Sequence, residues 1–556
     1  MPRASGGRSG QVNALCLLTD PLIRVQSTSG QAERLSLPQL LARMSSAEAL
    51  DFPMLRPHQQ PAWHAFLVQL AFLALDLAEA TEAPIEAAAW QVLLRGLTPD
   101  HPGDEAWCLV VDDWQQPAFL QSPCLPGAHA DYKRVLTSAQ EIDLLITSKN
   151  HDEKVGKMPR IGSDDADVVV FSLVSLQGFT GVLGAGKYNT MRMNSGYGSR
   201  AQFRLVFKRG SGPEFLRDLK VLLSQTDRLR EDAIEHSIGT TPLPHRLLWL
   251  APWDNAALAL DSVHPLCLEV CRRIRLRLAD GVLQALTASS KSARVDAKLR
   301  NGIVLDPWLP LVKEGGARAF TATASSFSYR LLSPVLFDGQ RYELPLLASP
   351  RAAEGSAGVL VAQVLVGGSG KTEGLLRREI PMRRRSLRKF GDARAELALR
   401  ARRFIEIAST LQGKVLRAAL LQFIDGSAEP DWKNGDFAKY VVRWTEHFDQ
   451  QVDEVFYEAL FDTIEAELTD QPAEAQWLQT LLPLAREVFQ QATEALPSRD
   501  RSRLFALARA EQLFRGGLIK QFGPLLPRGQ PSAADAATAT ATDTLAPPEP
   551  HHADPD

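Results

Sequence analysis

The stretch FAKYVVRWTEHFDQQVDEVFYEAL (Phe437–Leu460) decides the fold of the C-terminal part of the chain. Its apolar residues step by three or four positions: Phe437, Val441, Trp444, Phe448, Val452, Val455 and Ala459. Because this spacing places apolar side chains along one side of an α-helix, the stretch predicts a long helix with one buried face.

Similar patterns on both sides of this stretch predict three further helices. One covers about residues 394–424. The other two carry the apolar sets Trp477, Leu481, Leu484 and Val488, and Leu504, Leu507, Ala508, Phe514 and Leu518. Gly426, Pro430 and Gly435 separate the first two helices, and Pro472 starts the third. Four such helices with short connections predict a C-terminal four-helix bundle over residues 391–527.

The residues after the bundle have a different composition. Residues 528–556 are rich in Ala, Thr, Pro and Asp, with five acidic residues and one arginine. Such a segment has too little apolar surface to bury a core, so we expect a disordered acidic tail.

The residues before the bundle mix helix and strand patterns. A chain of 556 residues is too long for one hydrophobic core. We expect a helix at about 59–80 and strands at Cys108–Asp113, Val168–Leu176, 201–207 and 359–366. The fold class is therefore α+β, with a large mixed α/β domain over residues 1–390 ahead of the bundle.

Composition and the N-terminus limit the class of protein. The chain is 45% hydrophobic and 23% charged, its net charge is −3, and its five cysteines are too sparse for a disulfide framework. The N-terminus lacks the apolar core of a signal peptide. His64, Gln69 and Asp76 interrupt the most apolar stretch, which favours a buried helix over a membrane span. We expect a cytoplasmic protein.

The segment VGGSGKTE (Val366–Glu373) resembles a phosphate-binding loop in composition. That motif requires a glycine five positions before the Gly-Lys pair, and Leu365 stands there. A turn after a strand is the favoured interpretation. A stand-alone nucleotide-binding enzyme using this segment remains the alternative.

Two further groups carry residues with catalytic or metal-binding chemistry. His264, Cys267 and Cys271 have side chains that bind zinc, but their spacing favours one face of a half-buried helix, and no second pair lies nearby. His151 lies among acids and lysines without a nucleophile motif. We therefore expect no metal, no cofactor and no catalytic site.

The run from Arg377 to Arg403 has eleven Arg and Lys residues against three Asp and Glu. Basic side chains that neutralise phosphates release condensed counterions, which supplies sequence-independent affinity for nucleic acid. A solvated helix start with salt bridges explains the run equally well, and the sequence does not choose between the two.

The glycine-rich stretch GFTGVLGAGKYNTMRMNSGYGSR (Gly178–Arg200) is the most informative local feature. Glycines let a backbone approach another surface closely. Lys187, Arg192 and Arg200 alternate with tyrosines and Asn194. A backbone that can approach closely, cationic side chains and side-chain amides together suit a DNA minor groove, which is narrow and displays hydrogen-bond acceptors. A long β-connection is the structural alternative.

Several segments, in the same order along the chain, resemble the large subunit of Cascade, the type I-E CRISPR surveillance complex (the CasA family). They are LLTDPLIRV (17–25), LLITSKNHDEK (144–154), the glycine-rich stretch with RMNSGYGSR (192–200), HPLCLEVCRRIRL (264–276) with DPWLP (306–310), and ALARAEQLF (506–514). The resemblance covers about residues 13–525. A large subunit of a related CRISPR subtype is a further alternative.

The resemblance implies a function that is not enzymatic. Members of this family recognise the protospacer-adjacent motif in double-stranded DNA within a guide-RNA complex. They help to start strand separation, and they recruit a helicase–nuclease. The protein reads the short motif while base pairing reads the remaining sequence.

The resemblance also implies roles for individual residues. The family's glycine loop matches Gly184, Ala185 and Gly186, beside Lys187, Arg192, Asn194 and Arg200. The loop that contacts the guide RNA or other subunits matches Lys149, Asn150, His151 and Asp152. The wedge falls at Gly370, Lys371 and Thr372, without the glutamine often found there. The minor-groove lysine is Lys291 or Lys298. The paired-cysteine zinc site of some members is missing here.

Overall fold

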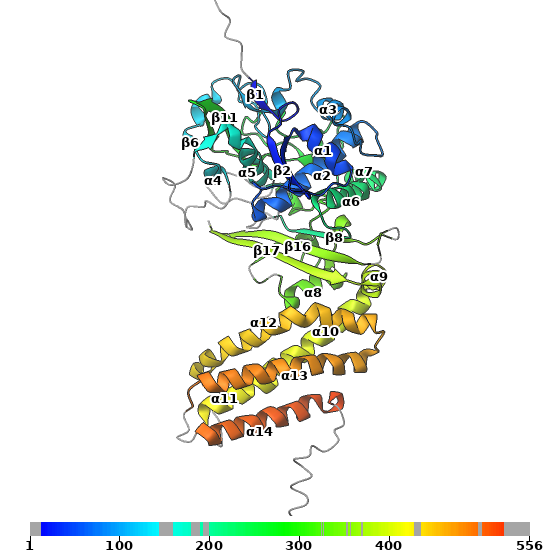
Figure 1. The fold of residues 1–556 in the computed structure, drawn as a ribbon, viewed down its shortest axis with the longest axis vertical. Coiled ribbons are helices and arrows are strands. Elements are labelled where there is room, and N and C mark those ends of the chain that lie inside the picture. Colours follow the sequence, from blue (N-terminus) through cyan, green and yellow to red (C-terminus); the bar gives the residue numbers. More distant parts are fainter. Residues whose placement is uncertain are drawn as a thin grey trace, which may run out of the picture. The chain divides into compact units, whose positions relative to one another are not determined.

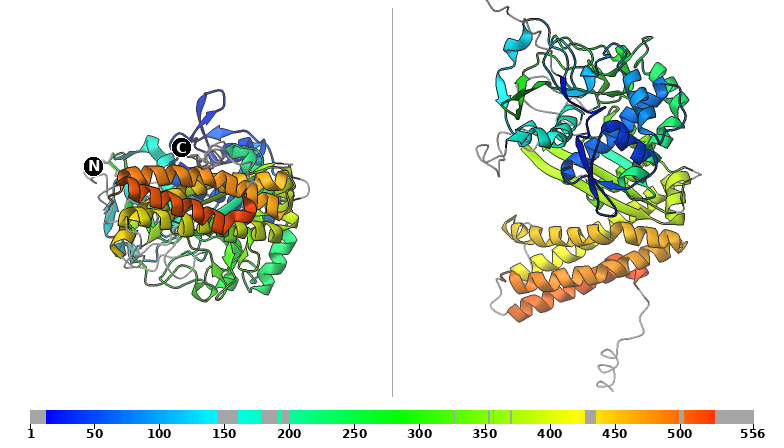
Figure 2. Two further views of the ribbon diagram at one scale, coloured as in Figure 1. Left: turned by 90° about the horizontal axis from the view of Figure 1, so that it is seen from below. Right: turned by 45° about the horizontal axis from the view of Figure 1, so that its top comes forward.

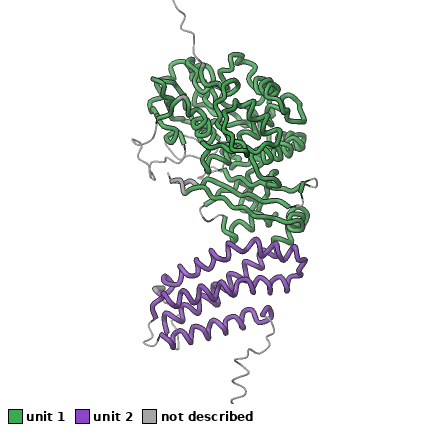
Figure 3. The backbone as a smooth tube through the Cα atoms, viewed as in Figure 1, with its two compact units in different colours: residues 1–399 green, residues 400–556 purple. Residues whose placement is uncertain are grey.

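The computed structural model describes residues 13–143, 160–178, 190–192, 200–323, 325, 327–351, 354–355, 357–368, 371–426, 435–498 and 503–526. The chain divides into two compact units, Met1–Leu399 and Arg400–Asp556 (Figure 3).

Unit 1 has a helical core that includes α2. The helices of this unit are α1 (Leu37–Ser45), α2 (Gln60–Leu77), α3 (Ala87–Gly96), α4 (Ala139–Ile142), α5 (Ala166–Gly178), α6 (Ser211–Leu223), α7 (Thr226–Glu235), α8 (Tyr329–Phe337) and α9 (Arg384–Asp392). Helix α2 packs against α3, α5 and α6 (Figure 1). Its side chains are buried almost throughout, as expected of a helix inside a core.

Small sheets surround this helical core. Their strands are β1 (Asn13–Cys16), β2 (Ile23–Ser27), β3 (Ala32–Leu35), β4 (Leu50–Asp51), β5 (Cys108–Val111), β6 (Arg134–Leu136), β7 (Ile161–Gly162), β8 (Gln202–Val206), β9 (His245–Leu247), β10 (Val263–Leu268), β11 (Arg273–Ala279), β12 (Val282–Ala288), β13 (Leu311–Val312), β14 (Arg318–Ala319), β15 (Tyr342–Glu343), β16 (Gly358–Gly368) and β17 (Lys371–Met382). The longest two, β16 and β17, form an antiparallel hairpin that β8 extends to three strands (Figures 1 and 2).

The polar residues that interrupt α2 each have a partner inside unit 1. His64 Nε2 lies 2.8 Å from an Asp218 carboxylate oxygen, and Gln69 Nε2 donates to the Leu266 carbonyl at 3.0 Å. These partners let polar groups sit in a buried helix without the cost of unmade hydrogen bonds. In the part of the chain that the structure describes, no helix has both the length and the apolar character needed to cross a bilayer.

Two secondary-structure predictions in unit 1 are wrong. Residues 168–176 belong to helix α5, not to a strand, because a run buried on all sides carries no period that separates the two. The predicted helix at His264–Cys271 is largely strand β10, which runs parallel to β9. The strands predicted at Cys108–Asp113, 201–207 and 359–366 correspond to β5, β8 and β16.

Unit 2 consists of long helices packed side by side (Figures 1 and 2). They are α10 (Arg394–Thr410, which begins in unit 1), α11 (Arg417–Asp425), α12 (Gly435–Glu465), α13 (Asp470–Ala495) and α14 (Arg503–Phe522). One π-helical turn, Leu411–Leu416, joins α10 to α11. The four predicted helices are therefore present, with α10 and α11 together forming the first of them.

The core of unit 2 forms around Trp477. Its ring stacks on Phe404 with centroids 5.1 Å apart, and its indole N–H donates to the Phe404 carbonyl at 2.9 Å. Phe456 meets the same indole edge-on at 5.8 Å. In the predicted apolar stripe of α12, Phe437, Val441, Phe448 and Val452 are buried, whereas Trp444, Val455 and Ala459 are only partly buried. Beyond Val452 the buried residues include Phe456 and Leu460.

Candidate nucleic-acid interface

The glycine-rich stretch is described at its two ends and at one point between them. Helix α5 ends at Gly178, the chain is described again at 190–192, and it resumes at Arg200. Gly184, Ala185, Gly186, Lys187 and Asn194 lie outside the described residues. The described residues therefore show how the stretch is attached to unit 1.

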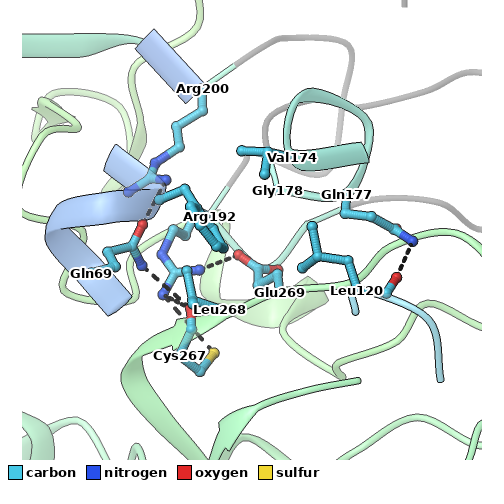
Figure 4. A pocket seen from close by; sticks show the side chains of 11 residues that line it. Gln69, Leu120, Val174, Gln177, Gly178, Arg192, Arg200, Cys267, Leu268 and Glu269 are labelled. Carbon is cyan, nitrogen blue, oxygen red and sulfur yellow. Dashed lines mark hydrogen bonds and ion pairs between the residues drawn. The ribbon is translucent and has the colours of Figure 1, made fainter. Parts of the chain in front are cut away.

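Arg192 attaches the middle of the stretch to strand β10 and the residue after it (Figure 4). Its guanidinium forms a buried ion pair with Glu269 and donates to the carbonyls of Pro265 at 2.7 Å and Cys267 at 3.0 Å. The other Glu269 oxygen accepts the backbone N–H of Met191 at 2.8 Å. The Glu269 carboxylate thus holds both the side chain of Arg192 and the backbone of Met191.

Arg200 attaches the far end of the stretch. Its guanidinium pairs with both carboxylate oxygens of Asp306, one of them at 2.7 Å, and donates to Gln69 Oε1 at 3.3 Å. The guanidinium carbon also lies 5.2 Å from the centre of the Trp308 ring. Asp306 and Trp308 belong to the DPWLP segment, so the structure brings together two of the segments that carry the resemblance.

Burial acts on the two guanidinium groups in the same direction but with different results. Burial lowers the pKa of Arg200, and the Asp306 carboxylate only partly opposes it. For Arg192, burial also acts to lower the pKa, but the charges of Glu269 and Asp306 and the contact with Cys267 together outweigh it and raise the pKa. Because both side chains are buried and paired, our prediction that their guanidinium groups contact DNA does not fit this structure; they position the stretch instead.

Gln177 holds the start of the stretch. Its side-chain amide donates to the Leu120 carbonyl at 2.9 Å, and its amide oxygen accepts the backbone N–H groups of Cys271 at 3.0 Å and Arg272 at 2.8 Å. A cavity of about 20 Å³ lies among Gln177, Arg192 and their neighbours (Figure 4), which is room for roughly one water molecule. The space among the residues that attach the stretch to unit 1 is therefore nearly filled.

The two candidate minor-groove lysines lie on the surface of unit 1. Both Lys291 and Lys298 are exposed. The backbone N–H of Lys291 donates to Asn255 Oδ1 at 3.2 Å. Between the lysines, the buried Arg294 donates to the carbonyls of Leu248 at 3.0 Å and Ala251 at 2.7 Å. The buried Arg294 thus fixes the segment 291–298, which presents one exposed lysine on each side of this arginine.

The segment Gly367–Thr372 is the tip of a β-hairpin. Gly367 pairs with Thr372 and Gly368 pairs with Lys371, so only residues 369 and 370 connect β16 to β17. Gly370 lies outside the described residues, and Lys371 and Thr372 are described by their backbone pairing only. A phosphate-binding loop runs from a strand into a helix, whereas this turn runs from one strand into the next.

The basic run Arg377–Arg403 is engaged within the protein at several points. Arg377 donates to Gln363 Oε1 at 2.9 Å, and Arg378 donates to the Phe327 carbonyl at 2.8 Å. These contacts favour the structural explanation over the nucleic-acid one for these two residues.

The residues that suggested zinc have other roles. Cys267 and Cys271 are buried, and burial raises the pKa of the Cys267 thiol to about 12, which opposes the thiolate form that zinc needs. His264 Nε2 lies 3.6 Å from an Asp76 carboxylate oxygen. Among the described residues no group of three or more metal-ligating side chains comes together. The loop with Lys149, Asn150, His151 and Asp152 lies outside the described residues.

Sequence reasoning missed the roles of Glu269 and Asp306. Both are acidic residues set among apolar ones, in PLCLEVC (265–271) and IVLDPW (303–308). A carboxylate in such a run needs a cationic partner once buried. That signal could have identified arginine partners, although not which arginines.

The model of the family described as CRISPR-associated protein Cse1 matches residues 17–488. A comparison with curated proteins finds no match.

Solved structures with the same fold include Cse1 from Acidimicrobium ferrooxidans, at 15% identity and TM-score 0.59, covering 94% of this chain and 100% of that chain. Thermus thermophilus CasA (Cse1) matches at 15% identity and TM-score 0.58, covering 91% and 100%. Thermobifida fusca Cse1 matches at 15% identity and TM-score 0.58, covering 92% and 99%. Since the family model matches well over half of the chain, this chain belongs to the CRISPR-associated protein Cse1 family, in agreement with its resemblance to the large subunit of Cascade.

Proposed function

We propose that this chain is the non-catalytic large subunit of a type I-E Cascade complex in the cytoplasm. It recognises the protospacer-adjacent motif in double-stranded DNA, helps to start strand separation and recruits the helicase–nuclease. Membership of the Cse1 family supports the assignment to a CRISPR complex. The observation that carries the DNA-binding role is the attachment of the glycine-rich stretch to the buried carboxylates of Glu269 and Asp306.

This attachment matters because recognition of a groove requires a preorganised surface. Residues that read a nucleic acid must be held close to their working geometry by supporting contacts. Glu269 fixes Met191 and Arg192, and Asp306 fixes Arg200. The residues between these points, together with Gly184–Gly186, are the proposed DNA-reading backbone, and Lys187 and Asn194 are its proposed polar contacts.

Other parts of unit 1 complete the proposed interface. Lys291 or Lys298 enters the minor groove, where its charge meets the acceptors displayed there. The turn between β16 and β17, with Gly370, Lys371 and Thr372, is the proposed wedge that separates the strands. The segment Lys149–Asp152 contacts the guide RNA or a neighbouring subunit.

The nucleotide-enzyme alternative loses its structural basis. Lys371 and Thr372 open strand β17, so no helix N-terminus follows the turn to hold phosphates. A role in nucleotide hydrolysis is not proposed.

The test is reconstitution of the guide-RNA complex with and without this chain. Binding is measured to two duplexes that share the target sequence and differ only in the flanking motif. We expect tight binding only for the complex that contains the chain and the duplex that carries the motif. Equal preference for the motif in the complex without the chain would overturn the proposal.

A further inference from the structure

Two cysteines face each other across the first strand pair of unit 1. In the antiparallel register of β1 with β5, Cys16 lies directly opposite Cys108. The backbone N–H of Leu17 donates to the Trp107 carbonyl at 3.0 Å, just outside this pair, while the Cys16 N–H donates to Asp20 Oδ2 at 2.8 Å. The two cysteines are therefore a pair without backbone hydrogen bonds between them.

This kind of pair suits a disulfide. Directly opposed residues of an antiparallel ladder project to the same face, and in pairs of this type the Cα atoms are about 4.5 Å apart. Disulfides span Cα separations of about 4.4–6.8 Å. Cys16 and Cys108 also pack in one small apolar cluster with Val111 and Ala118. The usual geometry of such a pair therefore matches the span of a disulfide.

We propose that Cys16 and Cys108 are a redox modification site, which a hydroperoxide converts to an intramolecular disulfide and a thiol reductant restores. Both cysteines are free thiols in this structure. Cys16 is partly exposed, whereas Cys108 is buried, so a small oxidant from solvent reaches Cys16 first.

The surroundings give the two thiols different roles. A hydrogen bond from the Cys108 thiol lowers the pKa of Cys16 to about 7, against the opposing effect of burial, with help from the Leu18 backbone and Thr19. The same contact and burial raise the pKa of Cys108. The Cys108 sulfur also lies 3.3 Å from the Asp104 carbonyl oxygen, a second acceptor for its single S–H proton. Cys16 is therefore the nucleophile and Cys108 the resolving thiol.

The reaction has two steps. The Cys16 thiolate attacks one peroxide oxygen, the O–O bond breaks, and the leaving hydroxide takes a proton to become water. The sulfur of Cys108 then attacks the Cys16 sulfenic acid, the S–S bond forms, and the Cys108 proton leaves with the hydroxyl group as a second water. Two thiols are oxidised to one disulfide while the peroxide is reduced to two waters.

The other three cysteines are less suited than Cys16 to react with the hydroperoxide. Burial raises the pKa of Cys267 to about 12 and that of Cys271 to about 11, so both remain thiols at neutral pH. The Cys271 thiol donates to the Leu176 carbonyl at 3.3 Å. Cys124 is buried as well.

The test treats the purified full chain with hydrogen peroxide and maps the peptides without reduction. We expect a mass loss of about 2 Da, from the two hydrogens removed, a cross-link between the peptides of Cys16 and Cys108, and full reversal by dithiothreitol. An unchanged thiol count, a cross-link to another cysteine, or a higher oxide on Cys16 without a cross-link would overturn the proposal.

Variants test the assigned roles. In Cys108→Ser, a sulfenic-acid trapping reagent should label Cys16, because the resolving thiol is missing. In Cys16→Ser, Cys108 should remain unmodified. The control Cys271→Ser should form the same cross-link as the wild type. Labelling of Cys108 in Cys16→Ser at the wild-type rate would contradict the order of the two steps, and the wild-type peptide map decides the proposal even if a variant does not fold.

Discussion

Arg192 and Glu269 form an ion pair from which water is almost excluded, since their side chains are 2% and 3% exposed. Removing one partner of such a pair leaves a buried, uncompensated charge and costs roughly 3–5 kcal/mol. We therefore expect Arg192→Met to lower the free energy of unfolding strongly, as measured by urea denaturation. The double variant Arg192→Met with Glu269→Leu should recover much of the loss, and a double variant as unstable as the single one would contradict this account.

The salt dependence of DNA binding tests the role of Lys291 and Lys298. A lysine in the minor groove lies between two phosphate backbones, and each neutralised phosphate contributes about 0.9 to the slope of log affinity against log salt. We expect alanine at the groove-binding lysine to reduce this slope by about 1 in the assembled complex. Lys220→Ala, at an exposed position on α6, is the matched control. If neither lysine variant changes the slope, this part of the interface is wrong.

Asp76 ties helix α2 to Arg230, Arg246 and His264 from three other segments, with Arg230 at 2.8 Å. Burial acts to raise the pKa of Asp76, but the hydrogen bond from His264 and the charge of Arg230 outweigh it and lower the pKa to about 2. Since this lies below the ordinary value of 3.8, the carboxylate stabilises the fold above about pH 4, and the stabilisation is lost as the pH falls toward 2.

Asp76→Asn should therefore lower the free energy of unfolding by roughly 2 kcal/mol at neutral pH, as measured by urea denaturation. The difference from the wild type should shrink between pH 4 and pH 2. A difference that stays constant over this range would show that the carboxylate charge is not the cause.

The buried face of α14 gives a test within unit 2. Phe514 is buried, whereas Leu504 is 78% exposed. Phe514→Ala should lower the free energy of unfolding by roughly 3–5 kcal/mol, because it leaves a cavity. Leu504→Ser should change it by less than about 0.5 kcal/mol, since it alters a surface position. A large loss in Leu504→Ser would contradict the observed helix orientation.

The same helix shows what the sequence could predict. The bundle helices were predictable because each carries an apolar stripe with a period near 3.6. In α14 the buried residues are Ala506, Ala510, Phe514, Leu518 and Phe522, and small alanines carry too little hydrophobicity to mark the face beside the exposed Leu504 and Phe505. The helix was therefore predicted correctly but its orientation only in part.

Unit 1 was harder to predict because its elements are buried on several sides. The runs 168–176 and 263–268 are both mostly apolar, yet one is a helix and the other a strand. Their tertiary neighbours decide the difference: Gln69 and Arg192 donate to carbonyls of β10 that a helix would have used internally. Such long-range partners leave no local period in the sequence.

Glycines and cations single out residues 178–200 in the sequence, but they do not show what the side chains of this stretch contact. Charge alone could not show that Arg192 and Arg200 turn inward to Glu269 and Asp306, because the pairs are 77 and 106 residues apart.

Motif-dependent DNA binding by the complex assembled with Gly184→Asp tests the DNA-reading role most directly. A carboxylate placed beside phosphates adds bulk and repulsion, so we expect the affinity for motif-bearing duplex to fall about tenfold or more, equal to about 1.4 kcal/mol or more. The control Gly96→Asp, at the exposed end of α3 where an added Cβ meets no neighbour, should bind as the wild type does. Undiminished binding by the Gly184→Asp complex would contradict the account.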